Sequence, residues 1–141
     1  MSVFQHEGEV SERRSVTPTG VLVVEFVWLP DGTSGNAVRE LREPLEGRLV
    51  QFETSYFSGM GGSPGNYSVY LYCELGTDWL SGRGAALAPG IPHIRSLFET
   101  HGGTRAGRTV VMGLPTLFVD AGKDDNDRGT VRLLLERDGG F

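Results

Sequence analysis

The sequence predicts an all-β protein, an antiparallel β-sandwich or jelly-roll-like barrel with an extended N-terminal arm. Its 21 glycines in 141 residues are about twice the average usage, and they separate short apolar runs as turns separate strands. Several runs alternate apolar and polar residues, while no segment keeps a helical period. This length suits one core, so we expect a single β-sandwich domain over residues 19–141. The polar residues 1–18 form the arm, either a frayed tail or a segment that orders against a neighbouring subunit.

The clearest strand covers residues 21–29, where β-branched and aromatic side chains dominate. The Pro30-Asp31-Gly32 sequence ends it, because proline presets φ and glycine accepts a positive φ in a turn. An antiparallel strand with one face in water alternates apolar and polar residues. Residues 21–29 are apolar on both faces, so we expect the second face to be covered by the same domain or by a partner.

The middle of the chain predicts shorter elements. Residues 36–45 favour a short strand or an irregular edge segment, since Pro44 and nearby glycines leave too few turns for a solid helix. Residues 49–54 predict a strand, and residues 58–65 are a loop by composition. Residues 67–75 alternate strictly and predict the next strand.

The last part of the chain predicts further strands. Residues 91–100 favour either a short strand or one helical turn. Residues 108–112 and 116–120 are separated by a Gly-Leu-Pro break, which we interpret as a bulge or kink within one long strand. Residues 129–136 alternate apolar and polar side chains, and the polar residues 121–128 before them are expected at a hairpin tip.

Charge and composition exclude several classes of partner. The formal net charge of −5 argues against nucleic acid, because its binders carry basic stripes that neutralise phosphates. No run of 18 apolar residues occurs, so we expect no membrane span. The polar residues 1–18 do not resemble a secretion signal, which predicts a protein made in the cytoplasm and not secreted. Cys73 is the only cysteine, and we expect a buried thiol within an apolar strand.

Catalytic and metal-binding patterns are missing from the sequence. Its three histidines never take ligand spacing, and Cys73 has no cysteine partner. The aspartates within residues 120–127 match only part of a calcium loop, so a solvated turn is favoured. The glycine-rich residues 58–65 lack the lysine and the following helix of a phosphate-binding loop. With no Gly-x-Ser-x-Gly elbow either, we expect no enzyme, no metal and no cofactor.

Tyr70 and Tyr72 lie on the more polar face of their predicted strand. Tyrosine is favoured where a surface is half apolar and half wet, notably at protein interfaces. The alternative is that this face packs against a second sheet, and the sequence leaves both readings open. With Phe26 and Trp28 from residues 21–29, the two tyrosines make up the four candidate interface residues.

A loose family resemblance spans most of the chain, including residues 17–29 and 36–54, and comes into view from Asn66 onward. The run Asn66-Tyr-Ser-Val-Tyr-Leu is followed by Gly76-Thr-Asp-Trp-Leu-Ser-Gly-Arg-Gly-Ala, and the last strand is Gly129-Thr-Val-Arg-Leu-Leu-Leu-Glu. This order is similar to that of small all-β virion structural proteins of tailed bacteriophages. The resemblance implies a capsid decoration, cement-type or other minor virion protein that acts by packing against other proteins.

The same resemblance implies partners and a location. The chain would form a symmetric homo-oligomer and contact other virion proteins such as a major capsid protein, with no nucleic acid and no membrane. It would lie in the virion after synthesis in the host cytoplasm.

Two other functions are compatible with the sequence. A small-molecule or glycan-binding β-sandwich module would use aromatic side chains on a loop rim as a platform. Residues 130–140 are also similar to the last strand and Gly-Gly tail of ubiquitin-like modifiers, with Phe141 as a removable residue. That β-grasp fold needs a solid central helix, and residues 36–45 predict a poor one.

Overall fold

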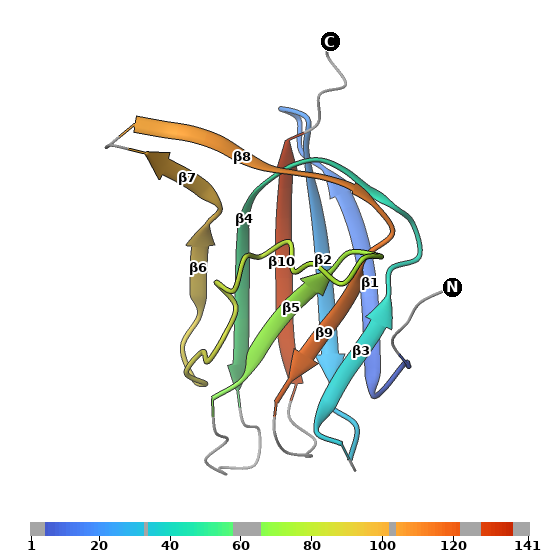
Figure 1. The fold of residues 1–141 in the computed structure, drawn as a ribbon. Coiled ribbons are helices and arrows are strands. Elements are labelled where there is room, and N and C mark those ends of the chain that lie inside the picture. The colour runs from blue at the N-terminus through green and yellow to red at the C-terminus, as the bar shows by residue number, and fades with distance from the viewer. Residues whose placement is uncertain (1–4, 33, 58–65, 102–103, 122–127, 137–141) are drawn as a thin grey trace.

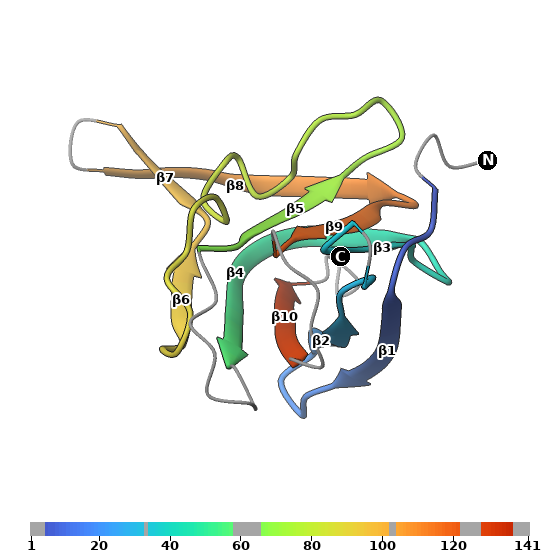
Figure 2. The ribbon, with the colours of Figure 1, turned by 90° about the horizontal axis from the view of Figure 1, so that it is seen from below.

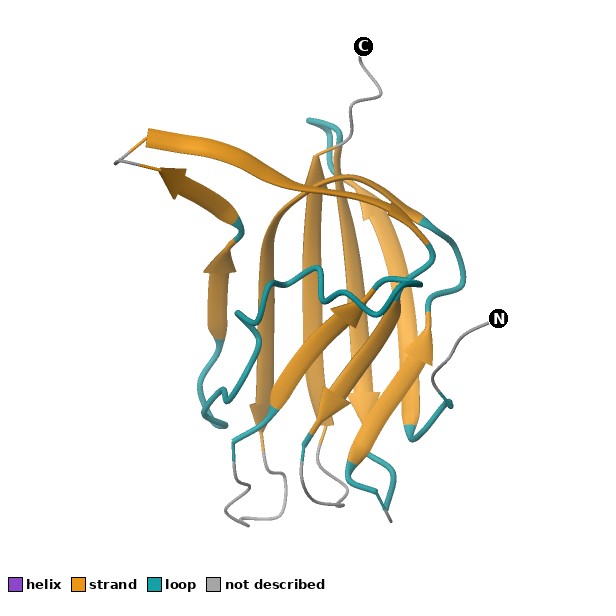
Figure 3. Ribbon diagram, viewed as in Figure 1, coloured by secondary structure: helices purple, strands orange, loops and turns teal. Residues whose placement is uncertain are grey.

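The computed structural model describes residues 5–32, 34–57, 66–101, 104–121 and 128–136. These residues form ten β-strands and no helix (Figure 3). The strands build two antiparallel sheets that pack face to face. The predicted all-β sandwich is therefore confirmed. The central helix of a ubiquitin-like modifier is missing from these residues, which overturns that alternative.

Seven of the described strands make up the larger sheet. Its path follows the order β1 (Glu9–Val16), β2 (Val21–Leu29), β10 (Arg128–Glu136), β4 (Leu45–Phe57), β8 (Thr104–Gly113) and β7 (Phe98–His101). β6 (His93–Ser96) pairs with the second half of β4, beyond the part of β4 that pairs with β8. The smaller sheet has the order β3 (Asn36–Glu40), β9 (Thr116–Asp120) and β5 (Ser68–Tyr72).

From β2 onward the chain passes back and forth between the two sheets. β3, β5 and β9 belong to the smaller sheet, and the chain between them returns to the larger sheet as β4, β6 to β8 and β10. Figures 1 and 2 show the two layers, with β3, β9 and β5 lying across β4, β10 and β2. Alternation of this kind is the jelly-roll arrangement of two Greek keys.

Alternate side chains of both sheets fill the space between the layers. Those from β2 and β10 are Leu22, Val24, Phe26, Trp28, Val131, Leu133 and Leu135, each 4% exposed or less. Trp28 packs against Tyr56 with ring centroids 4.8 Å apart, and Tyr56 packs against Tyr67 at 5.3 Å. The period of two in the sequence thus marks which side chains enter the core.

The second face of β2 is not covered within the described residues. Val21, Val23 and Leu29 are only partly buried there, and Val27 is 44% exposed. The reason is that β2 lies inside the larger sheet with this face directed away from the smaller sheet. The expectation of coverage by the same domain is therefore wrong, and the exposed face becomes available to other molecules.

The described part of the predicted arm forms β1, which pairs with β2 along its whole length. Glu12 and Arg14 face the inner side of the sheet, opposite Phe26 and Val24. Arg14 Nε donates to Glu12 Oε2 at 2.8 Å, and Arg14 Nη1 donates to the carbonyl oxygen of Pro44 at 3.0 Å. Charged side chains that point inward at an edge strand are a common protection against edge-to-edge pairing.

Two predicted connections differ from the structure because neighbouring strands lie in different sheets. Residues 113–115 do not kink one long strand: β8 before them is in the larger sheet and β9 after them is in the smaller sheet. Gly113 permits this crossing with a φ of +134°. β9 and β10 are likewise split between the sheets, so these two strands do not form the expected hairpin.

β5 is shorter than the predicted strand over residues 67–75 because the chain turns after Tyr72. The Asp78 carboxylate accepts hydrogen bonds from the backbone N–H groups of Leu71 and Leu80, each at 3.0 Å. These bonds hold the turn against the strand end. Cys73 therefore lies outside the sheet and is partly exposed, so the expectation of a buried thiol is wrong.

Some predicted features lie outside the described residues. They are the glycine-rich loop over residues 58–65, the aspartates within residues 122–127, and the C-terminal residues 137–141. Within the described residues, no helix is long and apolar enough to span a membrane.

Candidate functional site

Polar side chains gather on the outer face of the larger sheet, which points away from the smaller sheet. β10 lies between β2 and β4, and the strand register places residues of all three side by side. The two resulting rows are Glu25, Arg132 and Glu53, and next to them Val27, Thr130 and Ser55. These side chains point outward because the residues that alternate with them, such as Phe26 and Val131, are buried in the core.

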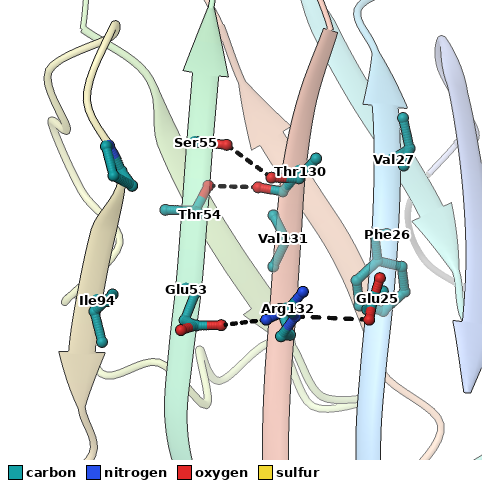
Figure 4. Close-up of a pocket in the computed structure, with 11 residues that line it drawn as sticks. Glu25, Phe26, Val27, Glu53, Thr54, Ser55, Ile94, Thr130, Val131 and Arg132 are labelled. Carbon is teal, nitrogen blue, oxygen red and sulfur yellow. Dashed lines mark hydrogen bonds and ion pairs between the residues drawn. The ribbon is translucent and has the colours of Figure 1, made fainter. Parts of the chain in front are cut away.

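In the first row, Arg132 contacts a glutamate on each side (Figure 4). Its Nη1 donates a hydrogen bond to Glu53 Oε2 at 3.1 Å, and its Nε lies 3.6 Å from Glu25 Oε1. The three side chains remain partly open to solvent, with Arg132 50%, Glu25 43% and Glu53 27% exposed. Exposed ion pairs stabilise a fold by only about 0–1 kcal/mol each, so the row contributes little to the stability of the fold.

The second row carries two hydroxyl groups. Ser55 Oγ and Thr130 Oγ1 lie 2.8 Å apart and share a hydrogen bond. A hydroxyl can donate once and accept twice, so this pair keeps hydrogen-bonding capacity toward a ligand. Beneath it, the buried Thr54 hydroxyl donates to the backbone oxygen of Thr130 at 2.9 Å, which ties β4 to β10 at this point.

Apolar side chains flank the two polar rows. Ile94 of β6 lies opposite Glu53 in register and is 58% exposed, and Pro92 just before β6 lines the same groove. Val27 on β2 is the apolar member of the second row, at the end away from β6, as Figure 4 shows. The groove has a volume of about 270 Å³. Pockets for drug-sized ligands usually measure roughly 300–1,000 Å³, so this groove suits a ligand of about one small ring.

The first row carries a formal charge of −1, which Arg13 on the neighbouring strand offsets. The groove lining contains two carboxylates, those of Glu25 and Glu53, and the Arg132 guanidinium. One strand further out, Arg13 of β1 is exposed and lies opposite Glu25 in register. Positive and negative side chains therefore alternate across the sheet. Opposite charges on neighbouring strands favour the observed pairing, and they leave this surface with no excess of either sign.

The groove offers groups for hydrogen bonding, but its described residues include only two carboxylates that could ligate a metal. Among the described residues, no three His, Cys, Asp or Glu side chains lie close enough together to ligate an ion. The groove residues can accept hydrogen bonds through carboxylates, donate them through a guanidinium, and do both through hydroxyls. Such a set matches a ligand that carries several hydroxyl groups.

An aromatic cluster occupies the outer face of the smaller sheet. Tyr70 and Tyr72 stack with ring centroids 5.3 Å apart, and both meet the Phe118 ring edge-on at about 6 Å. All three side chains are half-buried. Burial raises the pKa of the Tyr72 phenol, and the neighbouring Tyr70 and Asp78 raise it further. The phenol is therefore neutral at physiological pH. This aromatic cluster is apolar and uncharged.

The four predicted interface residues do not share a surface. Phe26 and Trp28 are 1% exposed and pack within the core of the chain. Tyr70 and Tyr72 belong to the aromatic cluster on the opposite side of the sandwich from the groove. The aromatic platform expected of a glycan-binding module therefore lies on the smaller sheet, while the hydrogen-bonding groups lie on the larger one.

A second hollow adjoins the end of β5, where Leu75 is 94% and Met112 is 74% exposed. Its carboxylate, that of Glu74, already accepts a hydrogen bond from the backbone N–H of Leu114 at 3.2 Å. Burial raises the pKa of the neighbouring Cys73 thiol, but hydrogen bonds from the backbone of residues 75–77 and from the Thr77 side chain outweigh burial and lower it. Fewer hydrogen-bonding groups converge here than in the groove on the larger sheet.

Glu25, Glu53 and Arg132 were not among the predicted site residues. Glu25 interrupts an otherwise apolar strand, and Arg132 is a polar position within the alternation of the last one, so each is visible as a polar outward position. Their meeting depends on register between strands more than a hundred residues apart, since Glu25 pairs with Arg132. A pattern within one strand carries no information on such a pairing.

Comparisons with known proteins add one structural likeness. No family model matches the sequence, and no curated protein matches it. Among solved structures, KdgF from Halomonas sp. matches with a TM-score of 0.35 and 12% sequence identity, over 94% of this chain and 84% of that protein.

The resemblance to phage virion proteins is wrong. The matched structure is KdgF from Halomonas sp., which gives no support to a capsid decoration protein or to virion partners. The residues that carried the resemblance have a general structural role: Asn66 begins the approach to β5, and Asp78 organises the turn after it. Alternating strands and polar turns of this kind occur across all-β folds. The predicted location in a virion rested on the same resemblance.

Proposed function

We propose that this chain binds a small, neutral, polyhydroxylated ligand, such as a simple sugar, in the groove over β2, β10 and β4. The observation that carries the proposal is the placement of Arg132 between Glu25 and Glu53, next to the hydroxyl pair of Ser55 and Thr130. Sugars present neighbouring hydroxyl groups that both donate and accept. Carboxylates and a guanidinium, fixed in a row by strand pairing, can bind such hydroxyls with little loss of side-chain freedom.

The apolar flanks complete the match to a sugar. A pyranose ring has C–H faces as well as hydroxyl edges, and the exposed side chains of Ile94 and Val27 can contact a C–H face. Small-ligand sites combine apolar lining with a few well-placed polar groups in the same way. The groove sits on paired strands, so its geometry exists before a ligand arrives.

Removing the hydroxyl pair should weaken binding without unfolding the chain. A panel of neutral hexoses (glucose, galactose and mannose) is titrated into the wild-type protein and into a Ser55→Ala/Thr130→Val variant, by calorimetry or NMR. Each lost hydrogen bond is worth about 0.5–1.5 kcal/mol, so we expect the double variant to bind the preferred hexose about 10-fold or more weakly.

The matched control is Glu46→Gln, because Glu46 is an exposed residue of β4 that pairs opposite Met112, away from the groove. This variant should bind as the wild type does. If no hexose in the panel binds the wild type, or if the double variant and the control bind equally well, the groove is not a sugar site.

We also propose that copies of the chain associate through the aromatic cluster of Tyr70, Tyr72 and Phe118. The cluster is a half-buried, uncharged set of aromatic side chains, the composition enriched at interface centres. A single self-complementary patch of this kind suffices for a two-fold dimer.

Tyr70→Ser/Tyr72→Ser tests this association by sedimentation equilibrium. The wild type should sediment as a dimer and the double variant as a monomer with unchanged circular dichroism. Leu75→Ser serves as the control, because Leu75 is an apolar side chain that is more exposed than those of the aromatic cluster but lies outside it. A wild type that stays monomeric, or a double variant that stays dimeric, contradicts the proposal.

A further inference from the structure

We infer that Glu25 and Glu53 make the groove selective against anionic sugars, because they already occupy the guanidinium to which a ligand carboxylate would bind. The inference rests on the proposed function and names the ligand class of the same groove: neutral hexoses and not their uronates. Arg132 is then a specificity-determining residue whose preference is set by its two carboxylate neighbours.

Few N–H donors of the Arg132 guanidinium remain for a ligand carboxylate. A guanidinium binds a carboxylate best through two parallel N–H donors. In this structure Nη1 is engaged by Glu53 Oε2 at 3.1 Å, while Nε faces Glu25 Oε1 at 3.6 Å. Both edges of the guanidinium that lie along the sheet therefore face a carboxylate. A uronate must displace one glutamate or accept a poorer, single contact from above.

The charges around Arg132 also disfavour an anionic ligand. A uronate placed over Arg132 lies close to two carboxylates and one guanidinium, so repulsion from the glutamates outweighs the attraction left in Arg132. On the neighbouring β1, the charged side chain beside this row is that of Arg13, which lies opposite Glu25 on the side away from Arg132. It offsets the charge of Glu25 in part but does not free the guanidinium. A neutral sugar meets no such repulsion.

The strand register determines which side chains lie beside Arg132. Arg132 lies on β10, and its register partners on β2 and β4 are Glu25 and Glu53 themselves. Strand pairing therefore fixes the backbone positions of the two glutamates on either side of Arg132. The selectivity therefore depends on which residues the sheet register places beside Arg132.

The test compares each neutral hexose with the uronate of the same ring: glucose with glucuronate, galactose with galacturonate, and mannose with mannuronate. Affinities are measured for the wild type, Glu25→Gln/Glu53→Gln and the control Glu46→Gln. We expect the wild type to bind the uronate about tenfold or more weakly than the matching hexose, a difference near 1.4 kcal/mol. Added salt should reduce the difference between the hexose and uronate affinities, because the groove is open to solvent and salt screens its charges.

In Glu25→Gln/Glu53→Gln the guanidinium is released from both ion pairs, while the glutamine side chains still bond sugar hydroxyls. We expect the order to reverse, with the uronate bound more tightly than the hexose, and Glu46→Gln to keep the wild-type order. Adding Arg132→Leu to the double variant should remove the gain for the uronate, which assigns the gain to the guanidinium.

The outcomes separate the two proposals. Failure of every hexose and every uronate to bind the wild type overturns the proposed function itself. Hexose binding with equal or tighter uronate binding in the wild type leaves the sugar site standing but overturns the selectivity. An unchanged preference in Glu25→Gln/Glu53→Gln overturns the role given to the two glutamates.

Discussion

Gly129→Ala is expected to destabilise the fold by about 3 kcal/mol, the upper end of the usual cost of overpacking a core. Gly129 of β10 pairs with Trp28 on β2 and with Tyr56 on β4. A Cβ atom at Gly129 would lie 2.0 Å from Cζ2 and 2.2 Å from Cε2 of Trp28. The indole is 1% exposed and packed against Tyr56, so it has no room to withdraw. Urea denaturation measures the loss.

Two further variants make this result specific. Gly32→Ala should change the stability far less, because a Cβ atom there meets no atom within 4 Å. Trp28→Leu removes the atoms that clash, so Gly129→Ala should cost much less in that background, and a double-mutant cycle gives the coupling. Equal urea midpoints for Gly129→Ala and the wild type would show that Trp28 does not occupy the described position.

Arg132→Ala is expected to weaken binding of the preferred hexose about 100-fold, since hydrogen bonds to charged groups contribute roughly 1.5–3 kcal/mol each. The substitution removes the donors of the groove centre and leaves Glu25 and Glu53 without the cation between them. Stability should change by only about 1 kcal/mol or less, because the ion pairs are exposed. Calorimetry measures the binding, and urea denaturation measures the stability.

Arg42→Ala is the matched control for charge, since Arg42 is an exposed arginine between β3 and β4, outside the groove lining. It should bind the hexose as the wild type does. If Arg132→Ala and Arg42→Ala lose affinity to the same extent, net charge and not the groove geometry governs binding.

The sequence allowed the fold class to be predicted because alternation along a strand is a local property. The apolar positions Val131, Leu133 and Leu135, which alternate with less apolar ones in residues 129–136, are those that enter the core. The same local view misplaced residues 113–115, where the chain changes sheet. A glycine and a proline mark a break there, but whether the next strand stays in the sheet or leaves it depends on long-range packing. The early end of β5 depends on Asp78, six residues beyond it.

The candidate site was predictable only in its components. The tyrosines at positions 70 and 72 were expected to share a partly wet face, and the structure places them together with Phe118, which the sequence had not linked to them. The groove escaped prediction because Glu25, Glu53 and Arg132 come from three strands far apart in the chain. Their arrangement follows from strand order and register, which single-strand patterns do not contain.

The most direct test of the central claim is where a sugar binds. Amide chemical shifts of the labelled protein are followed while the preferred neutral hexose is added. We expect the shifts to change at Ser55, Ile94, Thr130 and Arg132, and those of Tyr70, Tyr72 and Leu75 to stay unaffected. Shift changes confined to the aromatic cluster or to the hollow beside Cys73, with none in the groove, would contradict it.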